Sequence, residues 1–173
     1  NIEQGNVGVL LADNKLPRML QGRGDILPQA TSEALRILSK NSPKGFFVMI
    51  EGSQIDGGGH DNDAEAVISE LVDFDQAVRV AMDFADSHPG TLVVVTADHE
   101  TGGMSLPSDK DVILYGKTQP GDGNHATTAF STKGHTASMI PIYAYGAGAE
   151  RFTGIMDNTD IPKRMAELMG LEE

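Results

Sequence analysis

GFFVMIEGSQIDGGGH, residues 45–60, and TLVVVTADHE, residues 91–100, are the two stretches that constrain the architecture most. Each is an apolar run, rich in β-branched or aromatic residues, that stops at acidic residues and a histidine. In an open α/β sheet, ligands bind just beyond the carboxyl ends of strands. Two adjacent strands of this kind would surround one crevice with Glu51, Asp56, His60, Asp98 and His99. Carboxylate oxygens and imidazole nitrogens suit zinc or magnesium, so the sequence predicts a metal centre.

A helical pattern from Asp63 to about Ser87 connects the two stretches. Apolar residues recur there at helical spacing, and either Asp61 or Asp63 is a suitable N-cap. A strand at 46–50, a helix at 63–87 and a strand at 91–96 form a βαβ unit, in which the two strands run parallel. The prediction is therefore an α/β fold, with a mostly parallel sheet flanked by helices.

Other elements follow from local signals. We expect a short strand at Val7–Leu11, a loop over 16–28 and a helix at Gln29–Lys40 that Thr31 or Ser32 caps. Residues 101–135 are rich in Gly, Ser, Thr, Asp and Pro, and they predict a loop or hairpin excursion with β-prone pieces at 112–115 and 127–130. A final strand at Met139–Tyr145 contains Pro141, which favours an edge position. A last helix begins at Thr159 or Asp160.

Length and charge exclude several classes of function. The chain has 173 residues, which predicts a single domain over 1–173. The net charge of −12 argues against nucleic-acid binding, and it disfavours an anionic substrate unless bound cations reverse the local field. The absence of cysteine rules out thiolate ligands. There is no apolar run of about 18 residues, so no membrane-spanning helix is expected.

The candidate ligands each admit a second interpretation. Asp56 and His60 lie four residues apart and can face one metal ion, or they can form a solvated turn with a surface histidine. Asp98 and His99 can converge where a strand ends, or they can simply terminate it. Glu51 ends an apolar strand, where a buried carboxylate needs Mg²⁺ or a basic partner unless the strand end is exposed.

His135 precedes the final strand and can complete a three-ligand set with Asp56 and His60, leaving zinc an open position. It can equally be an ordinary loop histidine. His88, before Pro89, is expected to cap a helix C-terminus rather than bind metal. Composition and spacing therefore predict a cluster of oxygen and nitrogen ligands, and they identify no nucleophile.

Taken together, these stretches resemble the C-terminal part of the alkaline phosphatase family. The resemblance rests on FVMIEGSQID at 47–56 with His60, VTADHETGG at 95–103, and GHT at 134–136 followed by PIYAYG at 141–146. It runs from about Val7 to Gly170, and three separate motifs occur in the family's order. The fold that it implies is an incomplete three-layer α/β/α sandwich.

The resemblance also implies roles. Asp56, His60 and His135 would hold a first zinc, Asp98 and His99 would belong to a second, and Glu51 would bind magnesium. In the family, two zinc ions polarise a small-molecule phosphate monoester and activate a serine, which gives a phosphoseryl intermediate. The resemblance further implies a periplasmic or secreted location, and a homodimer is compatible with it.

The chain departs from the family pattern in what it lacks. The nucleophilic serine, in an Asp-Ser-Ala-type motif, and the phosphate-binding arginine lie upstream in the family and have no counterpart here. We therefore expect a C-terminal fragment with no catalytic residue of its own. Two alternatives remain: a phosphodiesterase, phosphomutase or sulfatase of the same superfamily, and a non-catalytic metal-binding module.

Overall fold

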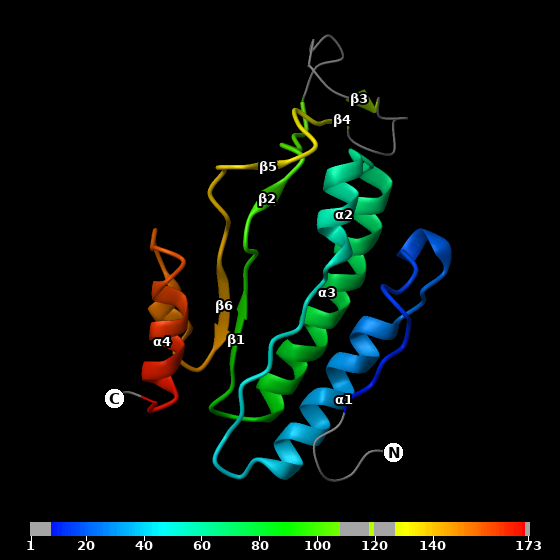
Figure 1. The fold of residues 1–173 in the computed structure, drawn as a ribbon. Coiled ribbons are helices and arrows are strands. Elements are labelled where there is room, and N and C mark those ends of the chain that lie inside the picture. Colours follow the sequence, from blue (N-terminus) through cyan, green and yellow to red (C-terminus); the bar gives the residue numbers. More distant parts are fainter. Residues whose placement is uncertain (1–7, 108–117, 120–126, 172–173) are drawn as a thin grey trace.

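The computed structural model describes residues 8–107, 118–119 and 127–171. Helix α1 packs along α3, α3 packs against the strands β1 and β6, and α4 lies on the far side of β6 (Figure 1). The helices are η1 (Met19–Gln21), α1 (Ile26–Asn41), α2 (Gln54–Asp61), α3 (Ala64–Ser87), η2 (Ala149–Phe152) and α4 (Asp160–Leu168). The strands are β1 (Leu92–Val95), β2 (Glu100–Thr101), β3 (Thr118–Gln119), β4 (Thr128–Ala129), β5 (His135–Thr136) and β6 (Tyr143–Gly146).

Helix α3 confirms the predicted helix between the two defining stretches. Its N-cap is Asp63, whose side chain accepts a hydrogen bond from the backbone N–H of Ala66 at 3.1 Å. It ends at His88, the predicted C-cap. Tyr145 in β6 donates a hydrogen bond to Asp86 at 2.6 Å, which links this helix to the strand pair. The helix therefore forms the central support of the described structure.

A buried ion cluster fastens the N-terminal loop to α3. Arg23 Nη2 lies 2.5 Å from Glu70 Oε2 and 2.8 Å from Asp73 Oδ2, and the three side chains are only 7%, 3% and 1% exposed. Burial disfavours the charge of Arg23, but hydrogen bonds to the two carboxylates outweigh it and raise the pKa of the guanidinium. Arg23 thus compensates the charge of two carboxylates that would be costly to bury unpaired.

The described sheet differs from the predicted parallel arrangement. Strand β1 pairs with β6, and β2 pairs with β5, both antiparallel. Residues 46–50 are extended and run in the same direction as β1 (Figure 1), but they form no ladder with it. Phe47 and Met49 are 61% and 82% exposed, while Phe46, Val48 and Ile50 are partly buried. The apolar run predicted an extended segment here, but strand pairing depends on distant neighbours.

Three further boundaries differ from the sequence prediction. Residues 8–11 form no strand, and Leu10 is 96% exposed. Helix α1 begins at Ile26 rather than Gln29, because Pro28 is tolerated in a first turn that needs no N–H donor. Thr31 is buried inside this helix, where its hydroxyl donates to the carbonyl of Leu27, so it is not the cap.

The C-terminal predictions agree more closely. Strand β6 covers Tyr143–Gly146, and Pro141 lies outside its ladder. Helix α4 begins after Thr159, as expected. Within the 101–135 excursion, the β-prone piece at 127–130 contains β4, whereas the piece at 112–115 lies outside the described residues. Among the helices that the structure describes, none has the length and apolarity that a membrane span requires.

We expect Arg23→Ala to lower the free energy of unfolding by about 3–5 kcal/mol, because it leaves two buried carboxylates unpaired. Arg36→Ala is the matched control, since Arg36 pairs with Glu33 at the exposed surface of α1. That variant should lose less than about 1 kcal/mol. Urea unfolding followed by circular dichroism measures the free energy of unfolding of both variants. Equal losses in the two variants would show that the buried cluster does not stabilise the fold.

Candidate metal centre

Helix α2 presents two of the predicted ligands on one face. Asp56 and His60 lie one turn apart, and His60 Nε2 is 3.3 Å from Asp56 Oδ1. The helix ends at Asn62, which has a left-handed backbone with φ of 54°. Its side-chain amide donates to the carbonyls of Gly59 and Thr132, at 3.0 and 2.7 Å. These bonds tie the end of α2 to the loop that precedes His135.

The strand pair β2–β5 supplies the other two imidazoles. His99 comes directly before β2, and His135 opens β5 opposite Thr101. Their rings stack with centroids 3.5 Å apart. Helix α2 lies beside this strand pair at one end of the fold (Figure 1). Segments far apart in the sequence therefore place three histidines and Asp56 together.

The close approach of α2 to β2 requires glycine. A Cβ atom at Gly59 would lie 2.8 Å from the carbonyl oxygen of Thr101, which is closer than real Cβ contacts allow. Gly102, with φ of 90°, faces the carbonyl of Gly59 in the same way. The glycine-rich sequence after Ile55 thus serves packing, because it lets the helix approach the strand that carries the opposing ligands.

Four potential ligand side chains converge at this junction. His135 Nε2 lies 3.8 Å from Asp56 Oδ1 and 3.3 Å from His60 Nε2. Asp56, His99 and His135 also offer ligand atoms that all lie within 4.8 Å of one another. One carboxylate and two or three imidazoles within this range match the donors that a divalent transition metal prefers.

Hydrogen bonding fixes which nitrogen of His60 faces the cluster. Its Nδ1 lies 2.5 Å from the carbonyl oxygen of Lys133, which can only accept, so Nδ1 carries the hydrogen. Nε2 of His60 then faces Asp56 Oδ1 and Nε2 of His135. These atoms can coordinate one cation when the facing nitrogens carry no hydrogen.

Thr101 sets the orientation of His99 in a similar way. Its hydroxyl donates to Asp56 Oδ1 at 2.6 Å, so it accepts the hydrogen bond from His99 Nδ1 at 3.2 Å. Nε2 of His99 then faces Asp98 Oδ2 at 3.2 Å. Asp98 and His99 thus form a second pair of potential ligands next to the first cluster, and the Thr101 hydroxyl connects the two groups.

The structure brings together five of the six predicted residues. Asp56, His99 and His135 form one group, His60 joins it through its contacts with Asp56 and His135, and the largely exposed Asp98 contacts His99 at its edge. Glu51 is exposed at the end of the extended segment and is not part of the metal-ligand group found among the described residues.

Sequence reasoning missed the residues that orient these ligands. Thr101 lay inside a quoted motif, but its role depends on the β2–β5 register. Lys133 acts through its backbone carbonyl, which leaves no signal in the side chain. Glu100 accepts from the backbone N–H groups of Gly103 and Met104 and from the hydroxyl of Thr136, and so holds the turn after β2.

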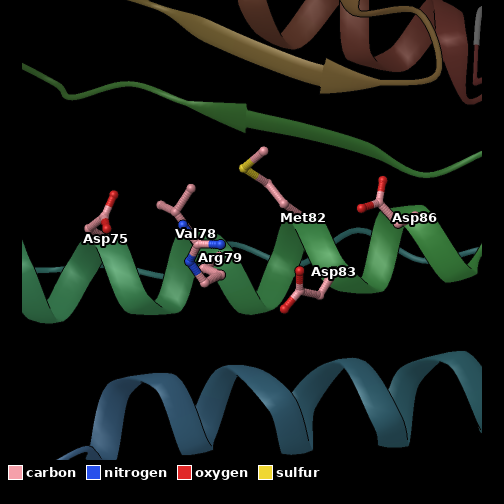
Figure 2. Close-up of a pocket in the computed structure, with 6 residues that line it drawn as sticks. All are labelled: Asp75, Val78, Arg79, Met82, Asp83 and Asp86. Atoms are coloured by element: carbon pink, nitrogen blue, oxygen red, sulfur yellow. The ribbon is translucent and has the colours of Figure 1, made fainter.

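A separate hollow of about 190 Å³ lies along α3. Val78 and Met82 point from the helix toward β1 in Figure 2, with acidic side chains at both ends. Its remaining lining residues are Asp75, Arg79, Asp83 and Asp86. This hollow contains none of the clustered histidines, so we do not assign it to the metal centre.

Comparisons with known proteins agree with the motifs. The family model for alkaline phosphatase matches residues 4–121 and 116–171. Alkaline phosphatase 3 of Bacillus subtilis is 34% identical, over 90% of this chain and 47% of its own length. The solved structure of alkaline phosphatase from the Antarctic bacterium TAB5 is 44% identical with a TM-score of 0.83, over 95% of this chain and 46% of that one. A mutant of that enzyme, described with magnesium bound, is 43% identical with a TM-score of 0.82, over 95% of this chain and 47% of the mutant's chain.

We expect the folded chain to bind Co²⁺, a spectroscopic substitute for zinc, with d–d absorption typical of nitrogen and oxygen ligands. His60→Ala and His135→Ala should each weaken binding at least about tenfold, because each removes a direct ligand. His88→Ala is the control, since His88 stacks on Phe84 at the end of α3. If all three variants bind Co²⁺ like the parent chain, the cluster is not the metal site.

Proposed function

Because the chain belongs to the alkaline phosphatase family, we propose that it supplies metal-binding residues of a phosphate monoester hydrolase. The observation that carries this proposal is the convergence of Asp56, His60 and His135, whose potential ligand atoms lie within 3.8 Å of one another. The chain spans about half the length of the curated relative Alkaline phosphatase 3. The activity that we propose is therefore that of the whole protein.

We assign a zinc ion to Asp56, His60 and His135, and a second zinc ion to Asp98 and His99. Three protein ligands leave tetrahedral zinc one open position, as catalytic zinc sites require. Glu51 is proposed as a magnesium ligand, because a carboxylate oxygen is a hard donor. Its exposure means that other oxygen ligands must complete that site.

Bound zinc ions would polarise the phosphate ester and neutralise its charge as it reacts. The chain's own residues prepare this site in three ways. The carbonyl of Lys133 holds His60 with Nε2 turned inward, and Thr101 does the same for His99 while it donates to Asp56. The glycine contact between α2 and β2 fixes the separation of the two ligand groups.

The proposal also accounts for the acidic character of the chain. A net charge of −12 repels phosphate esters. Two divalent cations would reverse the local field where the substrate binds. The metals, rather than a basic surface patch, would then provide the attraction for a small anionic substrate.

The serine nucleophile of the family has no motif counterpart among these 173 residues. We propose that it comes from sequence outside them, together with the remaining ligands of the second zinc and the magnesium. A periplasmic or secreted location and a homodimer also belong to this proposal. They rest on family membership alone.

We expect the zinc-loaded chain to hydrolyse p-nitrophenyl phosphate no faster than the same concentration of free zinc, because the nucleophile is absent. The Co²⁺-loaded chain should nevertheless bind inorganic phosphate. Paramagnetic broadening of the ³¹P resonance measures this binding, and His135→Ala should remove the broadening whereas His88→Ala should keep it.

Robust turnover that disappears in His60→Ala would show that the chain contains its own nucleophile. A loaded chain that leaves the phosphate resonance sharp would contradict the proposed substrate class.

A further inference from the structure

Helix α2 carries two ligands but has little helical stability of its own. It has eight residues, and three of them are the consecutive glycines 57–59. Each glycine costs about 1 kcal/mol relative to alanine, and a helix this short is not stable in isolation. Glycine is nevertheless needed, because Gly58 packs against Val67 and Gly59 against Thr101. The geometry of Asp56 and His60 must therefore be held by contacts from other segments.

One such segment is residues 16–23, which we name the strap. It contacts the first and the last residue of α2. The side-chain amide of Gln54 donates to the carbonyls of Leu16 and Pro17, at 2.7 and 3.2 Å, and Gln54 is buried. Arg18 Nη2 lies 2.7 Å from Asp61 Oδ2. Asp56 and His60 lie between these two attachment points.

The Arg18 side chain also lies along the helix itself. A Cβ atom at Gly57 would be 3.2 Å from Arg18 Nη2, so the guanidinium occupies the side of α2 that glycine leaves open. Donation from Arg18 holds the pKa of Asp61 below its usual range. The contact therefore combines close packing on the backbone with a charge-assisted hydrogen bond.

The strap is itself anchored to a rigid element. The backbone N–H of Met19 donates to Glu70 Oε1 at 2.8 Å, and Arg23 Nη1 donates to the carbonyl of Pro17 at 3.2 Å. Arg23 also forms the buried ion pairs with Glu70 and Asp73 on α3. A continuous set of contacts thus connects α3, through the strap, to both ends of α2.

We propose that the strap positions the metal-binding helix, with Arg18 and Gln54 as positioning residues that act through Asp56 and His60. This inference rests on the proposed metal site, because it assigns the strap a role toward that site. Neither residue touches the cluster, so the effect is on ligand geometry and order. Removing such support typically weakens metal binding about 10–100-fold.

Competition with a chromophoric chelator tests the proposal on the full chain. Arg18→Ala and Asp61→Asn should each weaken Co²⁺ binding about tenfold or more and change the intensity of the d–d bands. The double variant should lose no more than the stronger single variant, because both changes act on the same contact: Arg18→Ala removes its donor and Asp61→Asn removes its negative charge. Arg18→Lys should recover much of the affinity. Arg36→Ala, which removes an exposed ion pair on α1, should bind like the parent chain.

Hydrogen exchange on the metal-free chain provides a second measurement that needs no ligand. In Arg18→Ala, amides of residues 54–61 should exchange at least several-fold faster, while those of α3 remain unchanged. Asp61→Asn provides a second variant that should still fold even if Arg18→Ala does not, because Asp61 is an exposed residue. Uniformly faster exchange in both variants would show general destabilisation and overturn a specific positioning role.

The outcomes separate this inference from the proposed function. Unchanged Co²⁺ affinity, spectrum and α2 exchange in both Arg18→Ala and Asp61→Asn would overturn the strap proposal while the metal site remained. A parent chain that binds Co²⁺ but not phosphate would contradict the proposed function. A loss of Co²⁺ affinity in Arg18→Ala and Asp61→Asn would then still support the strap proposal.

Discussion

Three potential ligand atoms, Asp56 Oδ1, His60 Nε2 and His135 Nε2, face one another within 3.8 Å. A cation between these atoms would be attracted by all three when the facing nitrogens carry no hydrogen. The carbonyl of Lys133 accepts from Nδ1 of His60, so Nε2 faces the cluster. The rest of the described fold can be understood as the means by which this arrangement is kept in place.

The support comes from elements that are themselves well determined. Helix α3 is capped, long and packed on two sides, and it anchors both the strap and α2. The β2–β5 ladder fixes Thr101 opposite His135, and the turn after β2 is held by Glu100. Helix α2, which is weak by composition, lies between these rigid parts. The proposed ligands Asp56 and His60 thus lie on an element of low intrinsic stability, and their geometry depends on neighbouring elements.

Much of this arrangement could be predicted from the sequence, for definite reasons. Helix α3 and its Asp63 cap follow from local periodicity and capping chemistry. The spacing of Asp56 and His60 is a property of one helical turn. Residues 46–50 run in the direction predicted relative to β1, but among the described residues the ladder partner of β1 is β6. Pairing, like the roles of Thr101 and the Lys133 carbonyl, is set by contacts between distant segments that no local pattern encodes.

The most direct test of the central claim is anomalous diffraction at the zinc edge from crystals of the zinc-loaded chain. The account predicts a peak about 2.0–2.2 Å from a carboxylate oxygen of Asp56 and from Nε2 of both His60 and His135. A zinc ion bound elsewhere, or one that contacts His60 through Nδ1, would contradict it.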